Sequence, residues 1–333
     1  MPKLYLKEYG RAIAGKPVFI ACREGILRDY FQEIIADIKF LVRHGARTTL
    51  LHNLPNRFAN RQWITRLEQR LTATDIVRIS PEIDFYEAVL DHRRSMFKVI
   101  FLERRYLIDS QGNKINALTT GRARQSFAAP GDLIANVNFK GAMEAICRKI
   151  EAGECDRVHI LQAGKNAVKH ELFTVEGSGS LIANNFEEHF RQVNTDEDVA
   201  IVHRILNMYK RSGFLKPRSK AYLSKNRHAF YVTAIDGIVV GSVEKKIIDE
   251  KTVEMGALAI STRFRNQRVG VHTVKSFLDE MQAQGYTRLI SLTNNPRLET
   301  LYLRLGFVHE SRQEYQARQA LSPDVKMYFR RIG

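Results

Sequence analysis

The chain has 333 residues, of which 44% are hydrophobic and 26% are charged, a composition typical of a folded protein with room for two domains. It contains no apolar run of about 18 residues, the length that a membrane-spanning helix needs. Its first residues also lack the apolar core of a secretory signal. From these features we expect a cytoplasmic protein without a membrane partner.

The net charge of +16 is the unusual bulk property of the sequence. Such a charge is typical either of a nucleic-acid partner or of a basic surface that attracts small anions. The basic residues occur singly or in pairs, without a recognisable nucleic-acid-binding motif, so we expect small anionic ligands and no nucleic acid. Cys22, Cys147 and Cys155 share no metal-ligand spacing and are odd in number, so we expect neither a metal nor a disulfide framework.

The first half of the chain alternates predicted strands and helices, which favours a mostly parallel sheet covered by helices. Apolar runs predict buried strands, and an apolar stripe closed by Gly45 predicts a long helix. Gln111-Gly112 predicts a hairpin within residues 107–117. Strands are expected at residues 17–21, 48–52, 96–102 and 157–162, and helices at residues 27–42, 142–150 and 167–174.

A different order of elements begins at residue 190. Asp236-Gly237 between two extended segments is a strong hairpin signal. Asn295 followed by Pro296 predicts the start of a helix, and Gly306 predicts its end. Helices are expected from a cap at Asn194 or Thr195 to Tyr209, at residues 269–284 and at residues 296–305; strands are expected at residues 228–235, 238–243, 252–261, 287–292 and 325–330.

The segment RFRNQRVGVHT, residues 263–273, lies between a predicted strand and a predicted amphipathic helix. Gly270 near the helix start lets backbone N–H groups approach an anion, and the helix dipole adds about half a positive charge there. Arg263, Arg265 and Arg268 add basic side chains. The segment predicts a diphosphate site; the alternative is an ordinary exposed basic turn.

The order of elements after residue 190 resembles that of GNAT acetyltransferases. Residues 263–273 look like the family's pyrophosphate loop, with Gln267, Val269 and Gly270 in place and His272 where a small residue is usual. NNPRLETLYLRLGF, residues 294–307, resembles a second family motif. The resemblance implies acetyl-CoA as co-substrate, in contact with Leu258, Ile260, Arg265, Gln267, Arg268, Val269, Gly270 and Val271.

The same resemblance gives three catalytic candidates. Tyr302 matches the tyrosine that protonates the departing thiolate; the alternative is a ring that only packs in the core. Glu254 opens the strand EMGALAIST, where a carboxylate acts as a base through a water; the alternative is a surface charge at a strand end. Asn294 is a candidate for substrate contact or for helix capping.

The first half resembles the amino-acid-kinase-like domain of N-acetylglutamate synthases. Residues 5–52 resemble the family's opening, and ELFTVEGSGS within residues 157–182 resembles the end of that domain. The likeness is absent at residues 55–156, where the chain is much shorter than a usual member. It implies a kinase-like αβα sandwich with a mostly parallel sheet at residues 1–189 and a mixed-sheet α/β GNAT domain at residues 190–333.

Such enzymes acetylate the α-amino group of L-glutamate by direct attack of the amine on the thioester, in arginine biosynthesis. Phosphoryl transfer is not expected, because Cys22-Arg23 stands where a kinase has Gly-Gly. The resemblance also implies a homo-oligomer and an arginine effector. Glu171, Gly177 and Ser180 match parts of the arginine site, although the glycines also suit a backbone turn at the domain junction.

Substrate recognition follows the family's pattern only in part. Arg218 matches an arginine that pairs with a substrate carboxylate, and Lys216 lies beside it in the chain. A second family arginine has no clear counterpart, and Asp324 lies where it would repel a carboxylate. Two other hypotheses therefore stay open: acetylation of a different amino acid or amine, and a sensor that binds acetyl-CoA or an amino acid without catalysis.

Overall fold

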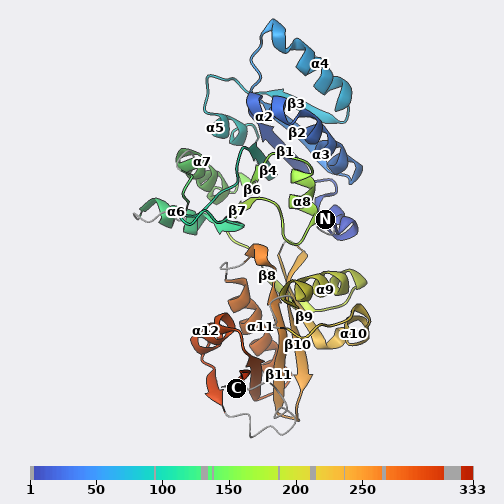
Figure 1. Cartoon of the computed structure of the whole chain (residues 1–333), viewed down its shortest axis with the longest axis vertical. Helices are drawn as coiled ribbons and strands as arrows, with labels where there is room; N and C mark the ends of the chain where they lie inside the picture. The colour runs from blue at the N-terminus through green and yellow to red at the C-terminus, as the bar shows by residue number, and fades with distance from the viewer. Residues whose placement is uncertain are drawn as a thin grey trace. The chain divides into compact units, whose positions relative to one another are not determined.

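A computed structural model describes residues 4–93, 95–128, 134–136, 139–186, 188–210, 215–235, 237–264, 268–310 and 324–332. The chain divides into two compact units, unit 1 from Met1 to Phe186 and unit 2 from Glu187 to Gly333. Each unit contains one sheet with helices packed against it (Figure 1). The sequence placed the domain boundary between residues 189 and 190, which lies inside the first strand of unit 2, Glu188–Gln192.

The sheet of unit 1 has the strand order β3-β2-β1-β4-β6-β7-β5. All its pairings are parallel except that of β6 with β7. After β1 the chain forms β2 and β3 on one side of β1 and then places β4 on the other side. The strands are β1 Pro17–Cys22, β2 Arg47–His52, β3 Thr74–Arg78, β4 Met96–Glu103, β5 Ala117–Thr119, β6 Cys155–Gln162 and β7 Ser180–Ala183.

Helices cover both faces of this sheet, with α3 and α8 on one side and α5 and α7 on the other (Figure 1). Between sheet and helices lies an apolar cluster that includes Phe19, Phe101 and Ile146. Unit 1 is therefore the αβα sandwich with a mostly parallel sheet that the sequence predicts. The helices are α1 Leu6–Ile13, α2 Glu24–Asp29, α3 Phe31–Arg43, η1 Phe58–Asn60, α4 Arg61–Arg70, α5 Phe85–Leu90, α6 Thr120–Ala128, α7 Lys140–Glu151 and α8 Ala167–Phe173.

Of two local predictions for unit 1, one was wrong and one is confirmed in a shorter form. The single helix expected at residues 27–42 is two helices, α2 and α3, because Tyr30 between them has φ −123° and ψ 30°, outside helical geometry. The hairpin expected at residues 107–117 is present but short, with one antiparallel bridge between Ile108 and Lys114 flanked by the backbone hydrogen bonds Asp109 N–H to Asn113 and Ile115 N–H to Leu107. The Asp109 side chain accepts hydrogen bonds from the N–H groups of Gln111 and Asn113, which closes the turn of this hairpin.

The sheet of unit 2 has the order β13-β14-β12-β11-β10-β9-β8 and is mixed, because only β11 and β12 pair in parallel. The predicted hairpin is β9–β10, with Gly237 at φ +77° in its turn. The mixed-sheet prediction is therefore confirmed. The strands are β8 Glu188–Gln192, β9 Phe230–Ile235, β10 Ile238–Ile247, β11 Thr252–Ile260, β12 Arg288–Thr293, β13 Val308–Glu310 and β14 Lys326–Arg331.

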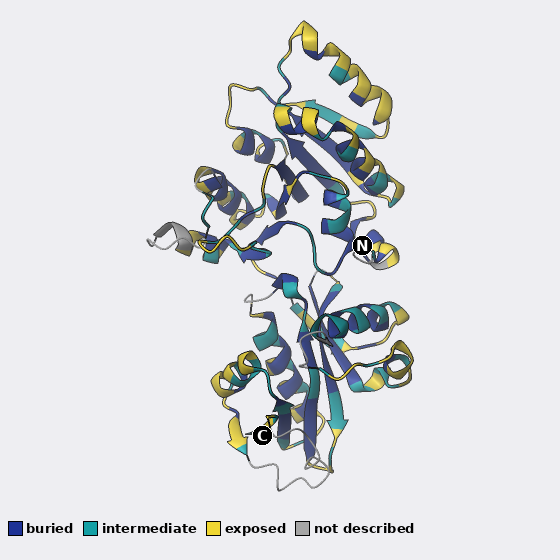
Figure 2. Cartoon of the chain, in the orientation of Figure 1, coloured by how far each residue is buried: buried dark blue, intermediate teal, exposed yellow. Residues whose placement is uncertain are grey.

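Helices α9 and α10 lie on one face of this sheet, and α11 and α12 lie on the other (Figure 1). The central strands β9 to β12 are mostly buried between them, whereas the edge strands β8 and β13 are partly exposed (Figure 2). The predicted start of α12 is confirmed, since the Asn295 side chain accepts a hydrogen bond from the Arg297 N–H and Pro296 is the first helical residue. The helices are α9 Asp196–Lys210, α10 Lys220–Lys225, η3 Arg227–Ala229, η4 Thr262–Phe264, α11 Val269–Ala283 and α12 Pro296–Arg304.

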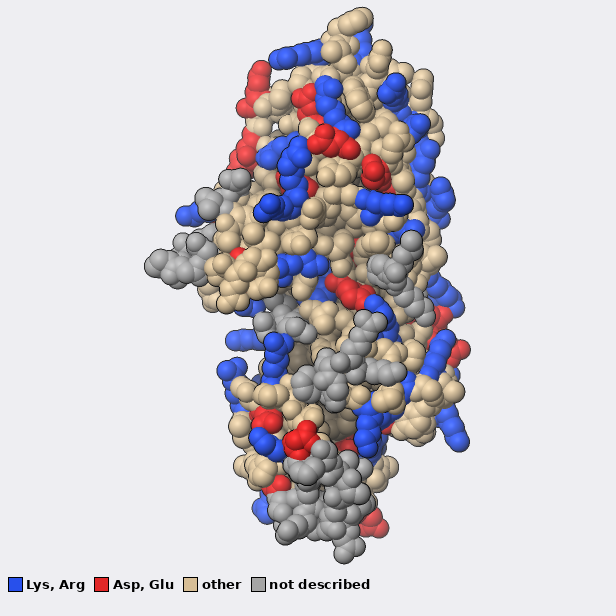
Figure 3. Space-filling view, in the orientation of Figure 1, with Lys and Arg blue, Asp and Glu red and all other residues tan. Residues whose placement is uncertain are grey.

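The surface carries both signs of charge. Figure 3 shows Lys and Arg side chains spread over the visible face of both units, with Asp and Glu between them. Within the described part of the chain, no helix combines the length and the apolar character that crossing a bilayer requires.

Candidate active site

Strands β11 and β12 pair along only part of their length. Their parallel register runs from Thr252 and Arg288 to Met255 and Ser291, whereas β11 continues to Ile260. Ala257 has φ +47°, and the register between β10 and β11 shifts nearby, which marks a β-bulge. Because the two strands separate after Met255, the end of β11 presents a free strand edge to the space between them.

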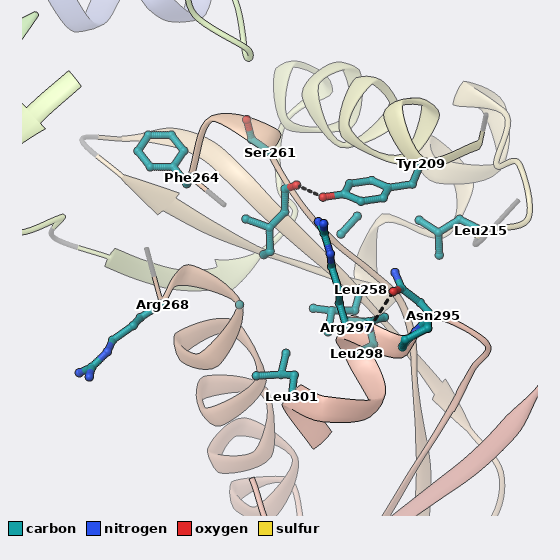
Figure 4. Close-up of a pocket in the computed structure, with 14 residues that line it drawn as sticks. Tyr209, Leu215, Leu258, Ser261, Phe264, Arg268, Asn295, Arg297, Leu298 and Leu301 are labelled. Carbon is teal, nitrogen blue, oxygen red and sulfur yellow. Dashed lines mark hydrogen bonds between the residues drawn. The ribbon is translucent and has the colours of Figure 1, made fainter. Parts of the chain in front are cut away.

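A pocket of about 580 Å³ opens beside this strand edge (Figure 4). Its walls come from the end of β11, the last turn of α9, and the first turns of α11 and α12. The lining is mostly apolar, and its polar side chains are those of Tyr209, Ser261, Arg268, Asn295 and Arg297. The lining residues are Tyr209, Leu215, Leu258, Ala259, Ile260, Ser261, Phe264, Arg268, Gly270, Asn295, Pro296, Arg297, Leu298 and Leu301.

The first turn of α11 forms one side of the pocket. Arg268 caps this helix in the left-handed conformation, at φ 64°, and its side chain extends away from Asn295 and Arg297 (Figure 4). Gly270 lines the pocket, where a Cβ would lie 3.7 Å from Leu301 and 3.8 Å from Ile260. The free N–H groups of this turn and the helix dipole make it suitable for an anion.

The structure brings half of the predicted coenzyme contacts into the pocket lining, namely Leu258, Ile260, Arg268 and Gly270. Val269 is fully buried at the start of α11, and Val271 is half-buried; neither lines the pocket. Arg265 and Gln267 lie outside the described residues.

His272 occupies the position where the GNAT loop usually has a small residue. Its Nδ1 lies 3.2 Å from Oε2 of Glu188 on β8. The larger side chain therefore reaches across to the edge strand of the sheet rather than into the pocket lining.

Tyr209 is a pocket residue that the sequence pattern did not single out. Its hydroxyl donates a 2.6 Å hydrogen bond to the backbone carbonyl of Ile260 (Figure 4). The bond fixes the end of α9 against the end of β11, and so holds one wall of the pocket in place. The position of Tyr209 as the last residue of a predicted helix gave no sign of this role.

Tyr302 lies where β11 and β12 separate. Its side chain, on α12, is buried. Its hydroxyl accepts a 3.0 Å hydrogen bond from the Ser291 hydroxyl. Ser291 and Met255 are the last paired residues of β12 and β11. Burial raises the pKa of Tyr302 to about 12, despite the opposing effect of the Ser291 hydrogen bond. The phenol is therefore protonated at neutral pH, and it lies behind the residues that line the pocket rather than among them.

Glu254 lies on β11 within a group of charged side chains shared with β10, which we call the carboxylate cluster: Arg218, Glu244, Lys246 and Glu254. Lys246 Nζ lies 2.8 Å from Glu254 Oε1, and Glu254 is 3% exposed. Gly256 lies opposite Glu244 and leaves room for the Lys246 ammonium, which a Cβ at this position would approach to 3.0 Å.

Glu244 holds the other side of the carboxylate cluster. It is 1% exposed, receives a 2.8 Å ion pair from Arg218 and accepts a 2.7 Å hydrogen bond from the Tyr222 hydroxyl. These contacts orient the Arg218 guanidinium, which also lies 5.6 Å from the Tyr222 ring. Arg218 is therefore tied to the protein's own carboxylate, while Lys216 two residues earlier is exposed.

Asn294 contacts Asp324, the residue at which the sequence departs from the family pattern. Its side-chain Nδ2 donates a 2.9 Å hydrogen bond to Asp324 Oδ2. Asn294 does not line the pocket, whereas the neighbouring helix cap, Asn295, does.

The residues matched to an arginine site in unit 1 are engaged with their own chain. Glu171 is fully buried, lies 2.6 Å from His159 Nδ1, and accepts hydrogen bonds from the N–H groups of Ser178 and Gly179. The Ser180 hydroxyl accepts from the Leu107 N–H, and Gly177 adopts φ +64° in the turn between them. These contacts stabilise the turn before β7. Among the described residues, no group of three His, Cys, Asp or Glu is placed to hold a metal ion.

Comparison with known proteins agrees with this geometry in unit 2. Residues 199–307 match the model of the acetyltransferase (GNAT) family. This segment carries a GNAT domain. It runs from within α9 to just after α12, and so contains the separated strands, the pocket, the first turn of α11, Tyr302 and the whole carboxylate cluster.

Curated relatives of the chain extend the likeness beyond the GNAT domain. Over 205 residues the chain is 26% identical to an amino-acid acetyltransferase of Vibrio cholerae, an alignment that covers 59% of this chain and 45% of the relative. Over 207 residues it is 27% identical to an amino-acid acetyltransferase of Pseudomonas fluorescens, covering 62% and 46%. The chain thus aligns with about half the length of these relatives.

A solved structure shares the fold of the whole chain. This is N-acetylglutamate synthase from Neisseria gonorrhoeae, complexed with coenzyme A and L-arginine. The likeness covers 97% of each chain at 17% sequence identity, with a TM-score of 0.55. The likeness shows that both αβ units of the chain share the fold of that structure.

Proposed function

We propose that the chain transfers the acetyl group of acetyl-CoA to the α-amino group of L-glutamate. The observation that carries the proposal is the pocket beside the separated ends of β11 and β12, which lies within the segment that matches the GNAT family. The names of the curated relatives, amino-acid acetyltransferases, support the choice of an amino acid as acceptor.

In this proposal acetyl-CoA binds in the pocket as co-substrate, without a metal. Its amide-bearing arm hydrogen-bonds to the free edge of β11, around Leu258 and Ile260, as an added strand would. Its diphosphate lies at the start of α11, near Gly270 and Arg268, with Val269, Val271, Arg265 and Gln267 as further contacts proposed from the family pattern. The net charge of +16 favours the approach of this anion.

The amine of the substrate attacks the thioester carbonyl directly. A C–N bond forms, the C–S bond breaks, and the thiolate leaves with the electron pair of that bond. Tyr302, at the point where the strands separate, donates a proton to the thiolate. Glu254 accepts the proton of the attacking amine through a water, while Lys246 holds its carboxylate in place.

The acceptor carboxylates require cations. Arg218, oriented by Glu244, is proposed to bind one of them, with Lys216 beside it. Asn294, which holds Asp324 in a hydrogen bond, is proposed to contact the substrate. A cytoplasmic location suits the three free and buried cysteines. Binding of arginine near Glu171, Gly177 and Ser180, and assembly into a homo-oligomer, are part of the proposal.

The test is thiol release from acetyl-CoA in the presence of single amino acids and polyamines. We expect glutamate to give the highest kcat/KM. Glu254→Gln should lower kcat at least about tenfold while binding of acetyl-CoA is retained, because the glutamine keeps the side-chain shape but accepts no proton. Turnover with another amine and none with glutamate would contradict the proposal that glutamate is the acceptor. Binding of acetyl-CoA without turnover of any amine would contradict the proposal that the chain is an enzyme.

A further inference from the structure

Unit 1 contains a cavity of its own, of about 730 Å³. It lies at the carboxyl ends of β1 and β4, and none of the residues discussed for acetyl transfer lines it. Its polar lining residues are Arg23, Tyr86, Glu103, Arg104, Arg105 and Asn136.

The topology of the sheet makes this a favourable place for a ligand. After β1 the chain adds β2 and β3 on one side of β1, and it then adds β4 on the opposite side. In open α/β sheets the crevice at the carboxyl ends of two such strands, where the strand order reverses, is the usual position of a ligand. Arg23 directly follows β1, and Glu103 is the last residue of β4.

The floor of the cavity carries a buried carboxylate. The Glu103 side chain is 12% exposed, and its Oε1 accepts a 2.6 Å hydrogen bond from the Tyr86 hydroxyl. The nearest guanidinium nitrogen of Arg23 lies 3.9 Å away, beyond hydrogen-bonding distance. Burial raises the pKa of Glu103, and a cationic group bound beside the carboxylate would favour its charged form.

The walls of the cavity carry positive charge. The Arg23 side chain is 43% exposed, and its guanidinium lies 4.9 Å from the centre of the Tyr86 ring, which orients it. Arg104 at the rim pairs with Asp29 at 2.9 Å, and both of these side chains are exposed. Arg105 adds a third guanidinium to the lining. The cavity thus presents an excess of arginines around one buried carboxylate.

We propose that this cavity binds a free amino acid with an acidic side chain. The ammonium group is held by Glu103, the α-carboxylate by Arg23, and the side-chain carboxylate by the arginines at the rim. A simple anion such as phosphate fits less well because it carries no cationic group of its own to lie beside the buried Glu103 carboxylate. The site is separate from the acceptor site proposed in unit 2.

Isothermal titration of the full chain with L-aspartate tests the proposal, with L-lysine, succinate and inorganic phosphate as comparison ligands. We expect aspartate to bind and the other three to bind at least about tenfold more weakly, because each lacks one of the complementary groups. Glu103→Gln and Arg23→Gln should each weaken aspartate binding at least about tenfold. Glutamine at position 103 still accepts the Tyr86 hydrogen bond, so the fold is expected to be retained.

Two variants serve as controls for the location of binding. Arg43→Gln removes an exposed arginine at the end of α3, and Arg218→Gln removes the proposed acceptor contact in unit 2. Both should leave aspartate binding unchanged. The proposal is overturned if aspartate does not bind at millimolar concentration, if phosphate or succinate binds as tightly, or if both cavity variants bind like the parent. None of these results depends on acetyl transfer.

Discussion

At the scale of single residues, the position of Tyr302 connects the fold to the proposed chemistry. Its hydroxyl lies at the last paired residues of β11 and β12 and stays protonated at neutral pH. We expect Tyr302→Phe to lower kcat about tenfold to a hundredfold with little change in KM for acetyl-CoA, because only proton donation to the thiolate is lost. Steady-state kinetics measures both constants, and Tyr286→Phe is the control. An unchanged kcat would assign Tyr302 to packing alone.

His52, at the end of β2, gives unit 1 a pH-dependent stability. Burial lowers the pKa of this imidazole from its ordinary value of 6.5 to about 4, and its Nδ1 accepts the Leu54 N–H. As the pH falls below 6.5 the unfolded chain takes up a proton and the folded chain does not, so stability is lost toward pH 4. Between pH 7 and pH 5 this loss is about 2 kcal/mol.

Denaturant unfolding of His52→Asn at both pH values measures this contribution. The asparagine oxygen still accepts the Leu54 N–H but does not titrate, so the variant should lose less stability than the parent between pH 7 and pH 5. Equal losses in parent and variant would show that His52 is not the group responsible.

At the scale of elements, the start of α11 is the proposed diphosphate site. Gly270→Asp places a negative charge in the pocket lining, while aspartate in the first turn of a helix favours the helix itself. We expect the folded variant to have a KM for acetyl-CoA raised at least about tenfold, with Gly270→Ala as the uncharged control. A KM that is the same for all three proteins would place the diphosphate elsewhere.

The turn before β7 depends on close packing against β6. A Cβ at Gly179 would lie 2.2 Å from Leu161 Cδ2 and 2.5 Å from the Ile160 carbonyl oxygen, whereas one at Gly141 in α7 meets nothing within 4 Å. Gly179→Ala should therefore lower the free energy of unfolding by about 1–3 kcal/mol, because backbone must move. Gly141→Ala should be neutral or slightly stabilising. Equal stability of the two variants, by denaturant unfolding, would contradict the packing described.

The sequence predicts best those elements whose burial is strong and local. Strands β1 and β4 are apolar runs buried in the middle of a parallel sheet, and α12 has a cap, an initial proline and a terminal glycine. Strand β3 and helix α4 carry weak signals, because β3 lies at the sheet edge and α4 buries only Leu67. Neither could be recognised from its own pattern.

The candidate site shows the same division. The glycine-containing loop could be located from the sequence because a strand, a glycine and an amphipathic helix follow one another in the chain. The Tyr209 bond to Ile260 and the Glu244 contact with Arg218 join residues from distant segments. No local sequence pattern predicts these two contacts, because they form only when α9 and α10 pack near the strands.

At the scale of the whole molecule, each unit has its own apolar core and its own cavity. The positive charge is dispersed among acidic groups rather than gathered into one extended patch on the visible face (Figure 3). This arrangement suits two sites for small anionic or zwitterionic molecules, acetyl-CoA in unit 2 and an acidic amino acid in unit 1. Both proposed sites lie in a chain that aligns with about half the length of its curated relatives.

The central claim is that the GNAT domain acetylates the α-amino group of glutamate. The most direct measurement is a competition in which the full chain, isotope-labelled acetyl-CoA and an equimolar mixture of the standard amino acids react together, with the products identified by mass spectrometry. The account predicts labelled N-acetylglutamate as the main product. A different acetylated amino acid as the main product, or no labelled product at all, would contradict it.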